Sequence, residues 1–272
     1  MKKLAQNCYS IISITWALLN LTFWMFPVIL VTLCKLILPS FRKTWSSAIN
    51  FLYHQGTRLN SFWMLRVIGI RIHVDGAFDD HPAPIIICNH QSWCDIPVIH
   101  HVVTDHGPII KFLIKRQLAW VPVIGWLCWM LEFPLLYRGQ GQDSRKKDYN
   151  TLRKFSEQAV DNSSAILIFP EGTRFTRTKQ AAQHSPYKHL LNPRIGGIRI
   201  LNEVLDPDTP IIDLTILYAG GNVNFWECLH GKVLDIHVNI KQFRLGDIDH
   251  MASWLNNRWQ EKDELLEAHN QD

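Results

Sequence analysis

The sequence lacks the short motifs of several common protein classes. Its six cysteines form no Cys-x-x-Cys pair, and neither a zinc-finger spacing nor an RNA-binding aromatic signature occurs. A Gly-x-Ser-x-Gly nucleophile elbow is also missing, which argues against a serine hydrolase. A disulfide framework is not expected in a chain of 272 residues, so reduced thiols are predicted. The net charge of +4 is too small to indicate nucleic-acid binding, but it suits an anionic partner such as a phospholipid.

Charge is missing from a long stretch near the N-terminus. No Asp, Glu, Lys or Arg occurs from Leu4 to Cys34, and basic residues flank this stretch on both sides. The 24 residues from 11 to 34 would span about 36 Å as a helix, enough for a hydrocarbon core of about 30 Å.

Two membrane topologies remain open for this stretch. It is either a single transmembrane helix or a helical hairpin that is broken near Pro27 and dips into one leaflet. Basic residues on both flanks favour the hairpin, because Lys and Arg prefer the cytoplasmic side. A cleaved signal peptide and a buried soluble helix are the less favoured alternatives. We expect a membrane anchor over residues 1–40, a connecting amphipathic helix over residues 41–66 and a separate domain over residues 67–272.

Downstream of residue 67, predicted strands alternate with predicted helices. The strands are expected at residues 69–75, 85–88, 109–114, 133–137, 165–169, 211–218 and 233–240. The helices are expected at residues 96–103, 115–131, 144–160 and 250–268. This alternation predicts an α/β fold with a mainly parallel sheet flanked by helices. The apolar residues 118–131 are too few to cross a bilayer, so they form either a core helix or a surface at the membrane interface or a lipid tunnel.

The first candidate site follows the apolar strand at residues 85–88. Its sequence is Asn89-His90-Gln91-Ser92-Trp93-Cys94-Asp95. A turn of this length can bring the Asp95 carboxylate to Nδ1 of His90 and leave Nε2 free for a hydroxyl group. Ser92 is close by, but nothing identifies it as a nucleophile. The pair therefore resembles a general base, although a single His-x4-Asp spacing also fits ordinary loop polarity.

A second group of polar residues follows the predicted strand at residues 165–169. It is Phe169-Pro170-Glu171-Gly172-Thr173-Arg174. Gly172 permits close approach of the backbone, and Arg174 can bind a phosphate with two hydrogen bonds. Glu171 can accept a hydrogen bond from a substrate hydroxyl or orient the arginine. Lys115 and Arg138 follow two further predicted strands, so four strand ends together favour base chemistry beside an anionic ligand.

These two motifs, in this order, resemble the first and third motifs of the PlsC-type glycerolipid acyltransferases. Leu135-Leu136-Tyr137-Arg138 resembles the second motif, except that Glu132 stands where the family usually has Gly. Lys115, with the Leu, Pro and Gly residues that follow it, is similar to another family segment. The stretches Asp213-x-Thr215-x-x-Tyr218 and Lys188-His189-Leu190-Leu191-x-Pro193-Arg194-x-Gly196 resemble the subgroup of lysocardiolipin acyltransferases and bacterial YihG-type proteins. The resemblance covers about residues 60–268.

The resemblance implies an acyltransferase domain over residues 67–272 with a defined mechanism. His90, held by Asp95, would deprotonate a hydroxyl of a lysophospholipid such as lysophosphatidic acid, and the alkoxide would attack the thioester of acyl-CoA or an acyl carrier protein. The substrate-binding residues would be Lys115, Arg138, Glu171, Gly172, Thr173 and Arg174. A non-catalytic membrane-interaction protein and a thioesterase are the alternatives.

The resemblance also implies where the protein acts and what it needs. The expected partners are the lysolipid, the acyl donor and the bilayer, with no nucleic acid, and the expected location is the cytoplasmic face of a bacterial inner membrane. No cofactor or metal is expected. The histidine-rich stretch that holds His100, His101, Asp105 and His106 is interpreted as surface or helix polarity rather than a metal site.

Overall fold

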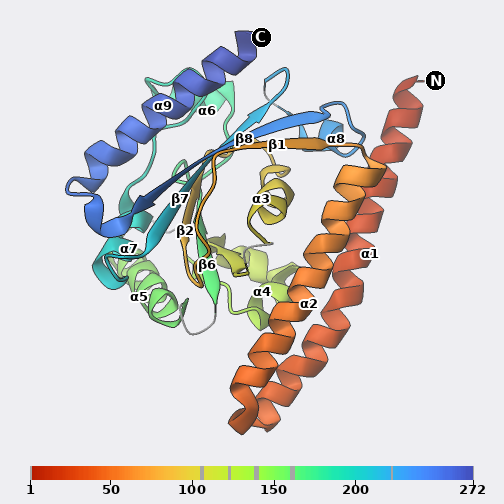
Figure 1. The fold of residues 1–272 in the computed structure, drawn as a ribbon, viewed down its shortest axis with the longest axis vertical. Helices are drawn as coiled ribbons and strands as arrows, with labels where there is room; N and C mark the ends of the chain where they lie inside the picture. The colour runs from red at the N-terminus through yellow and green to blue at the C-terminus, as the bar shows by residue number, and fades with distance from the viewer. Residues whose placement is uncertain are drawn as a thin grey trace.

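The protein folds around one mixed sheet of six strands. In the computed structural model, residues 2–104, 107–121, 124–137, 141–159, 163–221 and 223–271 are described. The strands are β1 (Arg71–Asp75), β2 (Ile85–Cys88), β3 (Ile109–Phe112), β6 (Ser164–Ile168), β7 (Pro210–Tyr218) and β8 (Asp235–Arg244). Their order is β1-β8-β7-β2-β6-β3, and every pair is parallel except the antiparallel β7 and β8. The predicted α/β fold with a mainly parallel sheet is confirmed (Figure 1).

Helices cover both faces of this sheet. They are α1 (Lys2–Ile37), α2 (Arg42–Phe62), α3 (Asp95–Val103), α4 (Ile124–Met130), α5 (Gln142–Ala159), α6 (Arg177–Ala182), α7 (Gly196–Val204), α8 (Phe225–Cys228) and α9 (Met251–Gln271). Helices α5, α7 and α9 pack on one face, and α3 lies on the other, next to the α1–α2 pair (Figure 1). Short 3₁₀ turns occur at Pro39–Phe41, Arg116–Trp120 and Leu245–Asp247, and α2 continues into a π turn at Trp63–Val67.

The central strands are buried on both faces because helices cover both sides of the sheet. Every residue of β2, β6 and β7 is buried. Along β2, Ile86 and Cys88 belong to the core on the α3 side, whereas Ile85 and Ile87 belong to the core on the α7 and α9 side. Continuous burial of this kind is typical of parallel strands. The three strands therefore lie in the centre of the domain, and the loops at their ends are attached to buried strands on one side.

The N-terminal segment forms a helical hairpin, but its turn is not at Pro27. Helix α1 is continuous from Lys2 to Ile37, and the chain reverses only at Pro39–Phe41 before α2 packs back along α1. The break predicted near Pro27 is therefore wrong. Met25 and Val28, on either side of this proline, are buried against Leu127 and Met130, and this packing offsets the hydrogen bond that Pro27 removes.

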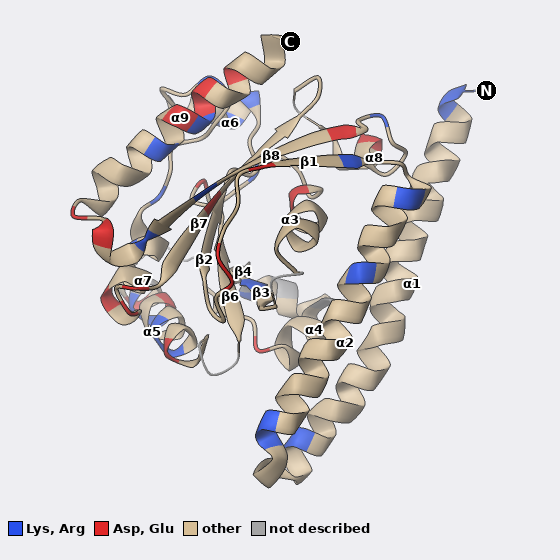
Figure 2. Cartoon of the chain, viewed as in Figure 1, with Lys and Arg blue, Asp and Glu red and all other residues tan. Residues whose placement is uncertain are grey.

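Much of α1 presents apolar side chains outward. Among the described residues, α1 is the one helix that is long and apolar enough to cross a membrane. Its basic residues are confined to its two ends (Figure 2). Large exposed side chains along it include Ile11, Leu19, Phe23, Phe26, Leu30 and Leu36.

The region after β3 differs from the sequence prediction. The strand expected at residues 109–114 ends at Phe112, and β4 (Ile114–Lys115) pairs instead with β5 (Leu135–Leu136) in a separate two-stranded sheet. The expected helix at residues 115–131 is divided into the turn at Arg116–Trp120 and helix α4. Local apolar composition did not show this division, because burial by β5 and α1 determines where each piece ends.

Candidate active site

His90 and Asp95 form a hydrogen-bonded pair at the end of β2. His90 follows the strand, Asp95 begins α3, and their atoms Nδ1 and Oδ2 are 2.7 Å apart. The same carboxylate oxygen accepts the backbone N–H groups of Gln91 at 2.7 Å and Ser92 at 3.0 Å. The turn therefore wraps around a carboxylate that is 0 % exposed. Because Asp95 receives only N–H donors at this oxygen, His90 donates from Nδ1 and keeps Nε2 as its basic nitrogen.

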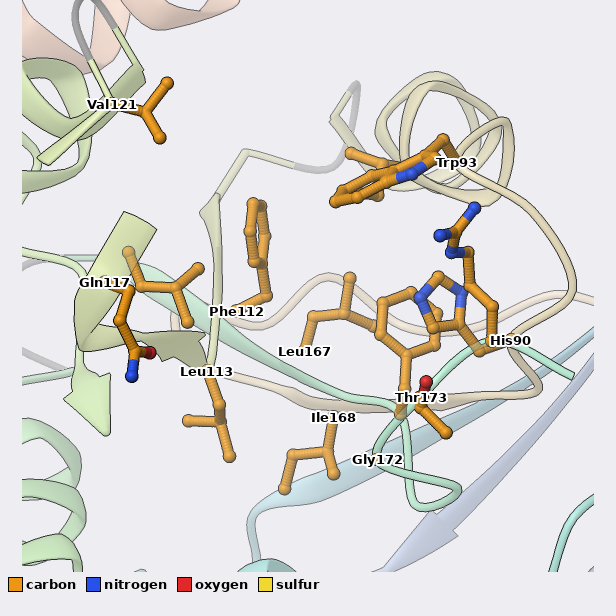
Figure 3. Close-up of a pocket in the computed structure, with 14 residues that line it drawn as sticks. His90, Trp93, Phe112, Leu113, Gln117, Val121, Leu167, Ile168, Gly172 and Thr173 are labelled. Carbon is orange, nitrogen blue, oxygen red and sulfur yellow. The ribbon is translucent and has the colours of Figure 1, made fainter. Parts of the chain in front are cut away.

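The imidazole of His90 borders a cavity of about 480 Å³. Its ring stacks on Phe169 with a centroid distance of 4.0 Å, and its side chain is 13 % exposed. Figure 3 shows His90 and Thr173 at one end of the cavity, Gln117 at the other end, and Leu167 and Phe112 between them. The cavity therefore offers a basic nitrogen at the end of a mainly apolar channel.

The loop after β6 supplies the part of the cavity wall next to His90 (Figure 3). Gly172, Thr173 and Arg174 line it, and the Arg174 guanidinium lies over the Trp93 ring at 5.1 Å. Gly172 adopts a φ of +70°, which an L-residue rarely adopts. Lys179 secures the loop, because its Nζ donates to Thr173 Oγ1 and to the Arg174 carbonyl, both at 2.8 Å.

Glu171 joins the loops instead of lining the cavity. Its carboxylate is 0 % exposed; Oε1 accepts the His90 backbone N–H at 2.8 Å and Oε2 accepts that of Leu191 at 2.9 Å. Burial raises the pKa of Glu171 to about 8, although the two N–H donors act in the opposite direction. The nearby Phe175 N–H donates to the His90 carbonyl at 2.7 Å. Both backbone polar groups of His90 are thus held by the loop after β6.

Two of the four predicted strand ends meet in this site. The ends of β2 and β6 are adjacent, whereas Lys115 belongs to the separate β4–β5 sheet and its side-chain position is not described. Arg138 lies outside the described residues. Asp105 and His106 also lie outside them, and His100 is packed against Tyr53 with its pKa lowered by burial to about 4.

Comparison with protein families decides the class. The family described as "Acyltransferase" matches residues 70–216, and "Acyltransferase C-terminus" matches residues 227–272. The first match covers more than half of the chain and contains both motifs that form the cavity wall. The chain belongs to the acyltransferase family.

Curated relatives agree with this assignment. The human 1-acyl-sn-glycerol-3-phosphate acyltransferase gamma is 32 % identical in an alignment 203 positions long, which covers 69 % of this chain and 53 % of the relative. An uncharacterized acyltransferase of Schizosaccharomyces pombe is 29 % identical in an alignment 216 positions long, which covers 68 % of this chain and 59 % of the relative. A 2-acyl-1-lysophosphatidylinositol acyltransferase of Saccharomyces cerevisiae is 25 % identical over 68 % of this chain and 61 % of its own length. The chain spans little more than half the length of these relatives.

A solved structure has the same fold over nearly the whole chain. The 1-acyl-sn-glycerophosphate acyltransferase PlsC from Thermotoga maritima aligns with a TM-score of 0.66 and 16 % sequence identity. The alignment covers 98 % of both chains. The N-terminal hairpin of this acyltransferase is therefore included in the shared fold.

Three residues of the site were not assigned a role from the sequence. The fully buried side chain of Asn89 donates to the Ile216 carbonyl at 3.0 Å and accepts from its N–H at 2.8 Å, so it joins the end of β2 to β7. Tyr218 donates to Asp95. The exposed Arg194 lies beside Gly172, where an added Cβ would be 3.5 Å from its guanidinium. Tyr218 and Arg194 stand in the two subgroup stretches, which were the available sequence signal.

Two further apolar cavities lie between the hairpin and α3. One of about 530 Å³ is lined by residues such as Trp16, Trp63 and Phe225, and it shares Trp93 and Ile96 with the His90 cavity. The other, of about 210 Å³, is lined by residues such as Trp24, Leu127 and Phe133, and it shares Ile96 and Phe112 with the His90 cavity. Two apolar cavities therefore adjoin the His90 cavity on the side of the hairpin.

Proposed function

We propose that this protein transfers a fatty acyl chain from an acyl thioester to a free hydroxyl of a lysophospholipid. The observation that carries the proposal is the His90–Asp95 pair. Asp95 holds Nδ1 of His90, and His90 itself borders the cavity. His90 Nε2 takes the proton of the acceptor hydroxyl, and the oxygen attacks the thioester carbon. The carbon–sulfur bond then breaks, and the thiolate leaves with the proton from His90. Asp95 stabilises the intervening imidazolium.

The cationic side of the cavity favours an acceptor with a phosphate group. Arg174 lines the cavity and Arg194 lies next to the same loop at Gly172. One guanidinium group can donate two hydrogen bonds to the oxygens of a phosphate. The two arginines are therefore suited to lysophosphatidic acid or a similar lysophospholipid. Thr173 and the Gly172 backbone complete this wall, and Lys115 and Arg138 remain candidate contacts. Glu171 contributes by fixing the loop.

The apolar cavities provide space for an acyl chain. They share walls with the His90 cavity and extend between α1, α2 and α3. The predicted role of residues 118–131 fits the part of this space that Leu127 and Leu131 line. The acyl donor would be acyl-CoA or an acyl carrier protein, and its chain would lie beside the same helices that face the lipid.

We also propose that the α1–α2 hairpin, within residues 1–66, lies in one leaflet and carries the domain of residues 67–272. Helix α1 contacts that domain near both ends, because Ser10 bonds Trp226 and Lys35 pairs with Glu132. These two positions are about 38 Å apart along a helix, more than the thickness of a hydrocarbon core. A spanning α1 would put Trp226 and Glu132 on opposite sides of the bilayer. An in-plane hairpin at the cytoplasmic face of a bacterial inner membrane avoids this conflict.

The decisive experiment measures acyl transfer by protein purified in mixed micelles. Lysophosphatidic acid, lysophosphatidylinositol and lysocardiolipin are each offered with labelled acyl-CoA or acyl carrier protein, and lipid products are separated from free fatty acid. Wild type is expected to form the acylated lipid, and His90→Ala is expected to lower kcat by about 10³-fold. Full activity of folded His90→Ala would refute the mechanism. Free fatty acid without acylated lipid would indicate a thioesterase instead.

A further inference from the structure

Tyr218 contacts Asp95 through the carboxylate oxygen that His90 does not use. Its hydroxyl donates to Asp95 Oδ1 at 2.5 Å, while Oδ2 accepts from His90, Gln91 and Ser92. Tyr218 is the last residue of β7 and is 1 % exposed. The two carboxylate oxygens are therefore held by donors from two separate parts of the chain, the turn after β2 and the end of β7.

Contacts between β7 and α9 hold the strand that carries Tyr218. Alternate residues of the strand face opposite sides, and Asp213 and Thr215 face α9, where both contact Lys262 at 2.6 Å and 3.1 Å. Arg258 also bonds Asp213, at 2.7 Å. Tyr218 lies on the other side of the sheet, in the core that also contains residues of α3. One face of β7 is thus anchored to α9, and the other presents a hydroxyl to the candidate catalytic pair.

The Tyr218 hydroxyl keeps its proton at neutral pH and therefore remains a hydrogen-bond donor. Burial, followed by the charge of Asp95, raises the pKa of Tyr218 well above its usual value. A neutral phenol beside a buried carboxylate forms a charge-assisted hydrogen bond, which is stronger than one between neutral groups. The bond therefore shares part of the negative charge of Asp95 with Tyr218.

We propose that Tyr218 is a positioning residue for the His90–Asp95 pair. By holding Oδ1, it orients the carboxylate so that Oδ2 faces His90 Nδ1, and it limits how strongly Asp95 attracts the imidazole proton. The inference rests on the proposed function, in which His90 acts as a base. A base works best when it is neutral before the reaction, so a weaker pull from Asp95 extends the useful pH range of His90 to lower pH.

Other charged or titratable side chains also surround the pair and belong in any account of its pH dependence. They are Glu171, which binds the His90 backbone, Arg174, which lies over Trp93, Lys262 behind β7, and the buried Cys88, Cys94 and Cys228. Substitution of Tyr218 replaces none of these groups, although Cys94 and Cys228 also interact with Tyr218. A control variant and a direct measurement on His90 are therefore needed to assign a change in the pH profile to the Tyr218–Asp95 bond.

The kinetic test compares Tyr218→Phe with Tyr187→Phe. Tyr187 is also buried, but its hydroxyl bonds the Asn256 carbonyl, away from the pair. Tyr218→Phe is expected to lower kcat about tenfold with little change in KM, and to move the acid limb of the kcat/KM profile upward by about half a pH unit. Tyr187→Phe is expected to keep the wild-type profile. An unchanged profile for folded Tyr218→Phe, or an equal loss in both variants, would overturn the proposal.

A second measurement does not depend on acyl transfer. The protein is labelled with ¹⁵N-histidine, His90 is assigned by its absence in His90→Gln, and its ring signals are followed through a pH titration. The titration midpoint of His90 is expected to rise in Tyr218→Phe, because Asp95 without the phenol donor holds the imidazolium more strongly. An unchanged midpoint overturns the proposal. A raised midpoint in a protein without acyl transfer would support it while refuting the proposed function.

A third test replaces the tyrosines by 3-fluorotyrosine, which keeps the phenol hydroxyl. The shift of the His90 titration midpoint should then be opposite in sign to the shift in Tyr218→Phe. Fluorination makes the phenol a stronger donor, so the His90 midpoint should fall slightly relative to unlabelled protein. The same labelling of Tyr218→Phe should have no effect. A fall of equal size in both proteins would show that another tyrosine is responsible and would overturn the assignment to Tyr218.

Discussion

The carboxylate of Glu171 accepts the backbone N–H of His90 at 2.8 Å, although the motif that contains Glu171 follows a different strand. The same side chain accepts the N–H of Leu191 at 2.9 Å. One buried carboxylate thus connects the loops that follow β2 and β6 with the chain before α7. Its protonation is coupled to folding because it is inaccessible to water in the native state.

Substitution of Glu171 is expected to change how stability depends on pH. Since burial raises the pKa of Glu171 from about 4.5 to about 8, the folded state binds a proton that the unfolded state has lost between these values. The contribution of Glu171 to the free energy of unfolding is largest below pH 4.5. It is lost as the pH rises toward 8, by up to about 1.4 kcal/mol per pH unit. Glu171→Gln does not titrate, so the stability difference, wild type minus variant, should shrink as the pH rises.

Thermal or denaturant unfolding in detergent at pH 5, 6, 7 and 8 measures this difference. Glu264→Gln, on the exposed side of α9, is the matched control and should follow the wild-type trend. A difference between wild type and Glu171→Gln that stays constant from pH 5 to pH 8 would contradict the expected protonation of Glu171.

Position 132 is expected to prefer glycine. Glu132 adopts a φ of +58° after α4, a conformation that costs an L-residue about 1 kcal/mol relative to glycine. Its ion pair with Lys35 spans 3.2 Å, but its own side chain is 44 % exposed, so the pair contributes about 0–1 kcal/mol. Glu132→Gly should therefore be more stable than Glu132→Ala by about 1 kcal/mol, or about 2 °C in Tm. Equal Tm values for the two variants would contradict this explanation of the glycine that the family usually carries.

Arg174 is expected to act mainly through acceptor binding. Its side chain lines the His90 cavity, and loss of a charge-assisted contact to a phosphate costs about 1.5–3 kcal/mol. Arg174→Gln should raise KM for a phosphate-bearing lysolipid by at least tenfold while its KM for the acyl donor changes little. Arg199→Gln, on an exposed position of α7, is the matched control. An effect on donor KM alone would assign Arg174 to the other substrate.

The two ends of α1 are expected to face the same side of the membrane. Single cysteines are introduced as Lys3→Cys and Lys43→Cys in a protein whose own cysteines are replaced by alanine or serine. Lys43 lies in the first turn of α2, just after the turn that ends α1. In sealed vesicles, a membrane-impermeant maleimide should label both positions from the same side, as the proposed one-leaflet hairpin requires. Labelling of the two positions from opposite sides would show that α1 spans the bilayer.

Much of the architecture could be predicted because it depends on local sequence. The apolar runs at Ile85–Cys88 and Pro210–Tyr218 are strands because both of their faces are buried. The His90–Asp95 contact could be predicted because five residues of a turn suffice to form it. The strand expected at residues 109–114 ends at Phe112, and the break expected near Pro27 does not occur, because contacts with β5 and with α4 decide the conformation there.

The sequence by itself determined the mainly parallel sheet, the His90–Asp95 contact and the family, since each depends on short segments whose order and spacing can be read directly. Tertiary structure decided what surrounds the pair. Tyr218 reaches Asp95 across 123 residues, and Glu171 reaches His90 across 81. The strand order β7-β2-β6 brings both contacts together, because it places the ends of β7 and β6 on either side of β2. Neither partner of His90 and Asp95 could be identified before that order was known.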